Sequence, residues 1–79
     1  MKVNIITPDT VLFTGDNIDL VQLPGIDGSF EIMNRHAPLI SVLKEGKIKI
    51  LTKGAPPRFF SVKGGVIEVL NNIVEILAE

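Results

Sequence analysis

The chain has 79 residues, which is enough for one small domain with a single hydrophobic core. It contains no cysteine, which excludes a disulfide framework and a thiolate metal site, and its net charge of -1 argues against nucleic-acid binding. Hydrophobic residues make up 46% of the chain and the mean hydropathy is +0.38, which is high for a free-standing domain of this length. A partner is therefore expected to cover part of the apolar surface.

The first part of the chain predicts short strands separated by turns. Residues 2–7, 11–14 and 18–23 are rich in aliphatic residues, and each run ends at a proline or glycine turn signal. Asp27-Gly28 is a favoured hairpin dipeptide, so we expect Gly28 to have a positive φ. No stretch could span a membrane and the N-terminal residues lack the apolar run of a signal peptide, so the cytoplasm is the expected compartment.

The stretch after this turn interrupts the strand pattern. Residues 29–33 predict a short strand with Phe30 and Ile32 on the core face. Residues 34–38 contain the only histidine and a proline, and they cannot form a regular strand. Residues 39–43 could be a strand or a helical turn. Polar groups on a bent backbone between strands are typical of a binding loop.

The second half of the chain begins with another pair of strands. Residues 47–52 alternate between isoleucines that face the core and lysines that face water, and residues 58–63 return as their partner after a proline-rich loop. Phe60 and Val62 share the core face of the returning strand. Phe59 then points outward, which makes it either a core residue of another layer or a candidate partner contact.

The last two strands predict a hairpin. Residues 66–70 and 73–77 flank Asn71-Asn72, which suits a two-residue turn because asparagine tolerates a positive φ. One face of this hairpin is wholly apolar and is expected to be core. The register pairs Val69 with Val74 and Ile67 with Ile76 on that face, and Leu70 with Ile73, Glu68 with Glu75 and Val66 with Leu77 on the other.

The second face of the hairpin places two like charges opposite each other between apolar pairs. Such a pair disfavours the strand pairing. We expect a cation, from Arg58, from Lys63 or from a partner, to lie over Glu68 and Glu75, and a partner to cover the apolar flanks. Eight to ten short strands with frequent turn signals predict an all-β fold, an antiparallel sandwich or barrel that takes up residues 1–79 as one domain.

No motif brings together the residues that catalysis needs. His36 is the only imidazole and no serine lies in a nucleophile motif, so the histidine ring is expected to bond local backbone or a partner. Asp27 and Glu31 could act as paired carboxylates only if the turn between them is ignored. One histidine with scattered carboxylates does not make a metal site, and Gly64-Gly65 lacks the lysine and helix of a phosphate loop. No catalytic residue, metal or cofactor is therefore expected.

A series of short motifs runs along the chain: Thr7-Pro8, Phe13-Thr14-Gly15-Asp16, Leu23-Pro24-Gly25, Asp27-Gly28, His36-Ala37-Pro38-Leu39, Glu45-Gly46-Lys47-Ile48 and the run from Val62 to Val69 with its double glycine. In their order and spacing they resemble the epsilon subunit of F-type ATP synthases, called delta in mitochondria. The resemblance implies a flattened sandwich of two antiparallel sheets of about five strands each. It also implies a subunit at the foot of the central stalk with no catalytic residue of its own.

The same resemblance implies partners. It predicts a rotor subunit that binds the gamma subunit and the c-ring and couples proton or sodium translocation to ATP synthesis. Such a subunit would lie peripherally on the cytoplasmic side of a bacterial inner membrane and touch the membrane only through the complex. The residues expected to face the c-ring and gamma are Asp27, Gly28, Ser29, Glu31, Asn34, Arg35 and His36. The sheet face expected to meet gamma carries Val66, Glu68, Leu70, Ile73, Glu75 and Leu77.

Two departures from the family pattern bear on these expectations. The family commonly has an acidic or amide residue where Ser29 stands and glycine where Glu31 stands, so the carboxylate has moved by two positions along one strand face. The family also usually continues into a C-terminal helical hairpin, whereas this sequence ends at Glu79, after the last expected strand. Inhibition by that hairpin and ATP binding are therefore not carried over.

Two other classes of small β domain are alternatives. A lipoyl or biotinyl carrier domain needs a lysine at an exposed hairpin tip, and Lys53-Gly54 is the nearest candidate, although its proline-rich loop is a poor match. A nucleic-acid-binding barrel would need a basic surface and exposed aromatic side chains, and the sequence offers neither tyrosine nor tryptophan. A mass increase on Lys53 would identify a carrier.

Overall fold

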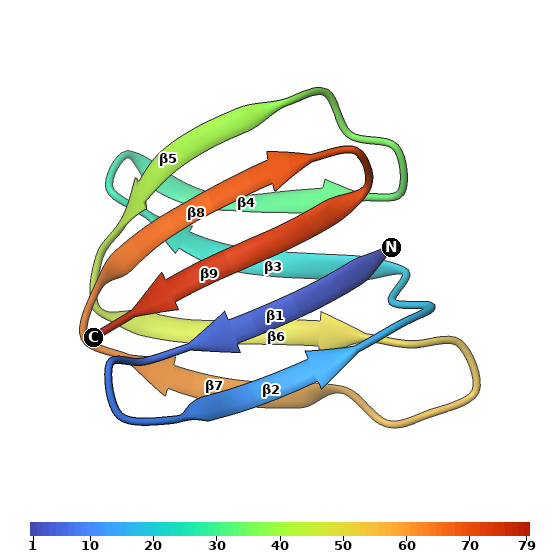
Figure 1. Ribbon diagram of the computed structural model, residues 1–79, viewed down its shortest axis with the longest axis horizontal. Coiled ribbons are helices and arrows are strands. Elements are labelled where there is room, and N and C mark those ends of the chain that lie inside the picture. Colours follow the sequence, from blue (N-terminus) through green and yellow to red (C-terminus); the bar gives the residue numbers. More distant parts are fainter.

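The computed structural model describes residues 1–79 and confirms the all-β prediction, with nine strands and no helix (Figure 1). Residues 39–43, for which the sequence left a helical turn open, form a strand. The strands are β1 (Lys2–Ile6), β2 (Val11–Gly15), β3 (Leu20–Gly25), β4 (Gly28–Met33), β5 (Leu39–Leu43), β6 (Gly46–Leu51), β7 (Arg58–Val62), β8 (Gly65–Leu70) and β9 (Ile73–Ala78).

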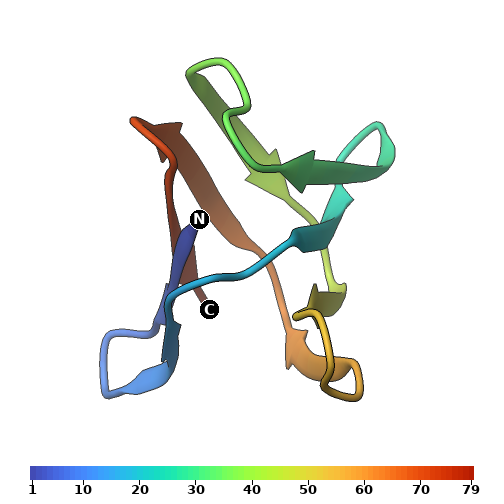
Figure 2. The ribbon, with the colours of Figure 1, turned by 90° about the vertical axis from the view of Figure 1, so that its right-hand side faces the viewer.

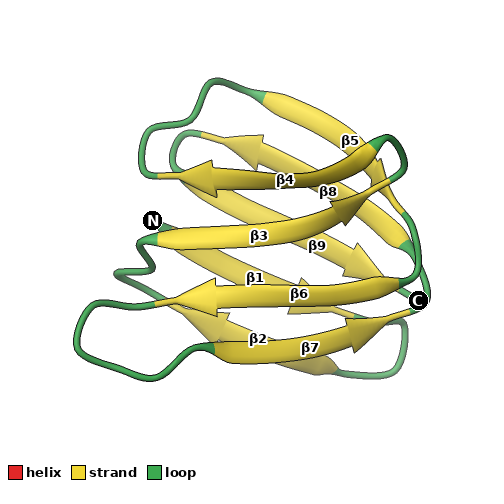
Figure 3. Cartoon of the chain, turned by 180° about the vertical axis from the view of Figure 1, so that it is seen from behind, coloured by secondary structure: helices red, strands yellow, loops and turns green.

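The strands form two layers that are joined along one side (Figure 2). In hydrogen-bonding order the first layer holds β2, β1, β9, β8 and β5, and the second holds β4, β3, β6 and β7. Figure 3 shows the second layer from its outer side. A single pair, Gly25 of β3 with Leu43 of β5, joins the layers. Neighbouring strands are antiparallel except β1 and β9, which run parallel.

The hydrophobic core lies between the two layers and follows from the alternation of the strands. Ile48 and Ile50 of β6 point inward, as predicted, while the lysines beside them stay outside the core. Phe30 and Ile32 anchor β4 to the core, also as predicted. Other fully buried side chains are Val3, Ile5, Val21, Leu23, Ile67, Val69, Val74 and Ile76.

The β8–β9 hairpin has the predicted register at every pair. Its two-residue turn has φ angles of 51° at Asn71 and 62° at Asn72, the left-handed values that a type I′ turn requires. Gly28 also has the predicted positive φ, at 127°, where it closes the β3–β4 hairpin. These two turns fix which side chains reach the outer faces, because a slip of one residue would exchange the two faces.

The free edges of the two layers, β2 and β7, are bridged by aromatic side chains. The ring centroids of Phe13 and Phe60 lie 5.4 Å apart, and the Arg58 guanidinium lies 5.0 Å and 5.3 Å from these two centroids. A cation above two aromatic faces gains electrostatic stabilisation and shields the edge of the core. The prediction that Arg58 covers the glutamate pair is therefore wrong, because its charge is held over Phe13 and Phe60.

Candidate docking surfaces

The outer face of the first layer carries most of the large apolar side chains that are exposed. We call the outer surface of β5, β8, β9 and β1 the apolar face. The strand register sets its side chains in rows: Val42 lies opposite Val66, Val66 opposite Leu77 and Leu77 opposite Ile6. A second row pairs Leu70 with Ile73, and Ile40 stands beside Glu68. The large exposed apolar residues of this face are Ile40, Val42, Val66, Leu70, Ile73 and Leu77.

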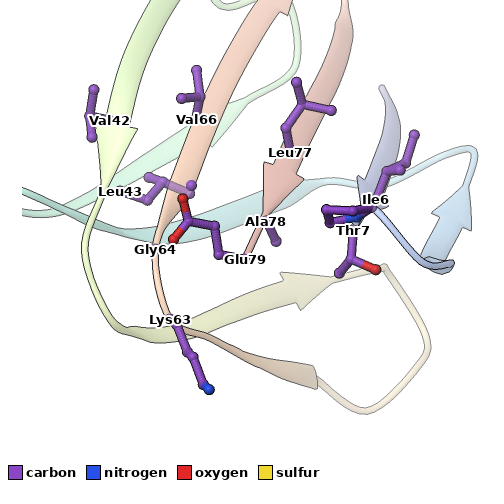
Figure 4. Close-up of a pocket in the computed structure, with 12 residues that line it drawn as sticks. Ile6, Thr7, Val42, Leu43, Lys63, Gly64, Val66, Leu77, Ala78 and Glu79 are labelled. Atoms are coloured by element: carbon purple, nitrogen blue, oxygen red, sulfur yellow. The ribbon is translucent and has the colours of Figure 1, made fainter.

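One end of the apolar face opens into a groove of about 690 Å³. Val42, Val66 and Leu77 lie side by side on its floor, and the Lys63 side chain points away from them (Figure 4). Lys63 is thus directed away from the apolar face and, like Arg58, is not the cation expected over the glutamates. The groove extends the apolar row to the end of the sheet.

A polar row crosses the apolar face between the two apolar rows. Glu68 lies opposite Glu75, Glu75 opposite Asn4 and Asn4 opposite Thr14. The Thr14 hydroxyl donates to Asn4 Oδ1 at 2.6 Å, and Asn4 Nδ2 donates to Glu75 Oε1 at 2.9 Å. One of the two glutamates therefore has an amide donor from its own chain. The predicted cation of a partner remains a prediction.

The predicted loop residues fall at the two opposite ends of β4 (Figure 1). Ile26 and Asp27 form the turn of the β3–β4 hairpin, and Gly28 pairs with Gly25 at the start of β4. Ser29 and Glu31 follow on the exposed side of β4, opposite Pro24 and Gln22. Ser29 and Glu31 do share one strand face, so the shifted carboxylate keeps the same direction. The tip adjoins the apolar face, since Ile26 N–H donates to Val42 O at 3.3 Å.

At the other end of β4, the loop from Asn34 to Pro38 is tied to its surroundings. Asn34 Oδ1 accepts a hydrogen bond from the Met1 ammonium group at 2.6 Å. Arg35 has a φ of 64°, and its N–H donates to Asn72 Oδ1 at 2.8 Å. His36 Nδ1 is 2.7 Å from Ala37 O, which is the local backbone bond expected for this ring. All three residues are exposed, and Asn34 differs from Arg35 and His36 in that its side chain also binds the Met1 ammonium group.

The outer face of the second layer is more polar. Its central row runs from Glu31 through Gln22 and Lys49 to Phe59. Phe59 is exposed, as its outward orientation predicted, and Met33 is the other large exposed apolar residue on these strands. Mixed charges and amides separate these two side chains, so this face offers a partner less continuous apolar surface.

Sequence reasoning missed the contribution of β5 to the apolar face. Ile40 and Val42 were in the one segment whose type was left open, and Ile6 lies on a strand whose partner could not be named. Reading residues 39–43 as a strand beside β8 would have placed Ile40 and Val42 on the face of Glu68 and Val66. The sequence Leu-Ile-Ser-Val-Leu gives no alternating pattern, so the segment itself carried no signal for which of its sides is exposed.

No group of three or more histidine, aspartate or glutamate side chains is placed to hold a metal ion. No helix in the structure is of a length and hydropathy that would cross a membrane. Lys53 lies on the β6–β7 loop, where its backbone N–H donates to Asp19 Oδ2 at 2.6 Å.

Comparison with known proteins gives a family match over the whole chain. The family model described as "ATP synthase, Delta/Epsilon chain, beta-sandwich domain" matches residues 1–79. Among curated proteins, an ATP synthase epsilon chain of Chlorobium limicola is 38% identical over 78 residues, which are 99% of this chain and 88% of the relative. An epsilon chain of Methylococcus capsulatus is 39% identical over 79 residues, and there the chain spans 56% of the relative.

Solved structures give the same fold. A chain in the central stalk and c-ring of the Tetrahymena thermophila mitochondrial ATP synthase superposes with a TM-score of 0.82 at 25% identity, over 99% of this chain and 62% of that one. A chain of the Euglena gracilis mitochondrial ATP synthase superposes with a TM-score of 0.88 at 14% identity, over 96% of this chain and 48% of that one, which shows the fold alone. None of these proteins is a carrier domain.

Proposed function

The chain belongs to the delta/epsilon family of ATP synthase subunits, whose β-sandwich domain it matches from end to end, and we propose that it is a non-catalytic central-stalk subunit that docks onto the gamma subunit and the c-ring. In this role it turns with its partners and couples proton or sodium translocation to ATP synthesis. It lies on the cytoplasmic side of a bacterial inner membrane, and it reaches the membrane only through the complex.

The apolar face is the observation that carries this proposal. Monomeric proteins seldom expose so many large aliphatic side chains on one sheet face, and such patches mark interaction sites. Burial of the Ile40, Leu70 and Leu77 side chains by a partner would contribute about 25 cal/mol for each Å² removed from water. The similar Tetrahymena chain belongs to an assembly of central stalk and c-ring, which supports a stalk partner for this fold.

The two ends of β4 are assigned to different contacts. The hairpin tip at Asp27 and Gly28, with Ser29 and Glu31 behind it, is proposed to meet the polar loops of the c-ring. Arg35 and His36, at the far end, adjoin the β8–β9 turn through the bond from Arg35 N–H to Asn72 and are proposed to lie beside gamma. The β3–β4 turn has only two residues, and the bond from Ile26 N–H to Val42 O holds it beside β5. A preorganised turn loses less conformational entropy on docking than a long loop would.

Co-purification tests the proposal. The tagged chain, co-expressed with the gamma subunit from the same source, is expected to form a stable complex, and the midpoint of its thermal unfolding should rise on binding. At a gamma concentration 100 times Kd the gain is about 2.7 kcal/mol, or roughly 11–22 °C for a domain of this size. If the chain retains no gamma subunit and its unfolding midpoint does not move, the proposal is wrong.

The c-ring contact is tested by changing the exposed side of β4. The double variant Ser29→Ala, Glu31→Ala is expected to lower ATP synthesis driven by an ion gradient in the reconstituted complex, while the unfolding midpoint of the isolated chain stays within a few degrees. Both side chains are exposed, so their truncation leaves the core intact. Truncation of the exposed Ser61 on β7 is the matched control. Loss of folding in the double variant would mean that this strand face is structural.

A further inference from the structure

A partner can contact the centre of the apolar face only through its side chains. β8 is paired with β5 on one side and β9 on the other, and β9 is paired with β8 and β1. Their backbone groups are therefore occupied by the sheet, so a partner cannot bind there by adding a strand. An α-helix satisfies its own backbone and docks by side chains alone, so it is an element that fits this surface.

The rows of the apolar face match the spacing of residues on such a helix. Along β8 the rows are two residues apart, or about 6.6 Å. Residues four apart on a helix are about 6.0 Å apart along its axis. A helix lying along β8 and β9 would thus present its first, fifth and ninth residues to successive rows. These rows are Leu70 with Ile73, then Glu68 with Glu75, then Val66 with Leu77.

The row of Glu68 and Glu75 determines which kind of side chain the fifth residue of the docked helix must carry. Glu68 and Glu75 lie opposite each other and, together with Leu70, Asn71 and Ile73, line a hollow of about 220 Å³. Glu75 accepts one hydrogen bond from Asn4, whereas no hydrogen bond or ion pair within the chain reaches the Glu68 carboxylate. A helix that covered this hollow with an apolar side chain would desolvate two opposed carboxylates without compensation.

We propose that the apolar face binds an amphipathic helix of the gamma subunit with apolar residues at its first and ninth positions and a lysine or arginine at its fifth. The basic side chain enters the hollow between the two carboxylates, and its neighbours cover the apolar rows. This inference rests on the proposed function and adds the recognition rule of the same surface. The opposed carboxylates of Glu68 and Glu75 destabilise the free chain. In the complex, the same two carboxylates make the apolar face select a helix with a basic residue.

The substitution Glu68→Gln tests this inference, because it should not lower the stability of the chain but should weaken its binding to gamma. Glu68→Gln keeps the shape of the side chain and removes the like-charge contact, so the unfolding midpoint of the isolated chain should stay or rise. The Kd for the cognate gamma subunit should rise about tenfold, with a weaker dependence on salt concentration. Glu75→Gln is the second variant and should behave alike. Glu45→Gln, an exposed glutamate on the β5–β6 turn, is the control and should change neither quantity.

The outcomes separate this inference from the proposed function. If Glu68→Gln and Glu75→Gln bind gamma as tightly as the wild type or more tightly, while Leu77→Asp binds it poorly, the apolar face is the docking site and the basic helix is wrong. If the wild-type chain does not bind gamma at all, the proposed function fails and the inference fails with it. Weaker binding of both glutamine variants at an unchanged unfolding midpoint supports the basic helix.

Discussion

Gly65→Ala is expected to lower the free energy of unfolding by about 3–5 kcal/mol. Gly65 opens β8 with a φ of 151°, and a Cβ built there would lie 2.4 Å from the carbonyl oxygen of Leu77. Alanine would therefore need a strained backbone and would push β9 away from β8. A chain of 79 residues has roughly 4–12 kcal/mol of stability in total, so the variant should be partly or wholly unfolded at 37 °C.

Gly54→Ala is the matched control for this effect. Gly54 has a φ of 81°, but a Cβ added there meets no atom within 4 Å, so only the backbone strain of about 1–2 kcal/mol applies. Thermal unfolding followed by circular dichroism should place the midpoint of Gly65→Ala well below that of Gly54→Ala. Equal midpoints would show that contact with Leu77 O adds nothing and that strain alone sets the cost.

The local parts of the fold were predictable because short-range chemistry determines them. The β8–β9 register follows from Asn71-Asn72, whose asparagines allow the left-handed turn, and from the alternation on either side. The β3–β4 hairpin also forms where Asp27-Gly28 predicted a turn, but its loop residues are Ile26 and Asp27, and Gly28, with its positive φ, already pairs with Gly25. In both cases a shift by one residue would move a whole row of aliphatic side chains from the core into water.

The long-range parts of the fold could not be predicted from such patterns. The parallel pairing of β1 with β9 brings Asn4 to Glu75, which are far apart in the chain, and nothing in either strand specifies the other. The position of Arg58 above Phe13 also depends on the meeting of two sheet edges. The sequence therefore could not exclude Arg58 as the cation over the glutamates, and the cation of a partner stays a prediction.

For the candidate docking surfaces, the sequence indicated which residues to consider better than it indicated how they are arranged in space. The outward side of the β8–β9 hairpin was identified because its glutamates stand opposite each other between apolar pairs. The residues from Asp27 to His36 were expected to face the same partners, but the strand β4 separates Asp27 from His36, and Asn34 is held by Met1. The sequence could not predict that the Asn34 side chain is held by the chain itself while that of Arg35 is not, because only the tertiary fold supplies the Met1 partner.

Leu77→Asp is expected to weaken binding to the gamma subunit by at least about 100-fold, which corresponds to about 2.7 kcal/mol. Leu77 lies in the apolar row between Val66 and Ile6, is 59% exposed in the free chain, and lines the groove with Val42 and Val66. Burial of an aspartate there would desolvate a charge beside the existing glutamates. Because the side chain is already half in water, the cost to folding should stay near 1 kcal/mol.

Phe59→Asp is the matched control, because Phe59 is 57% exposed but lies on β7 in the other layer. Its Kd for gamma should stay within about threefold of the wild-type value, since it lies outside the apolar face. Leu77→Gln separates the loss of apolar contact from the added charge, and it should bind between the wild type and Leu77→Asp. If Phe59→Asp weakens binding as much as Leu77→Asp at equal unfolding midpoints, gamma does not select the apolar face, and the outer surface of β4, β3, β6 and β7 becomes the better candidate for the stalk contact.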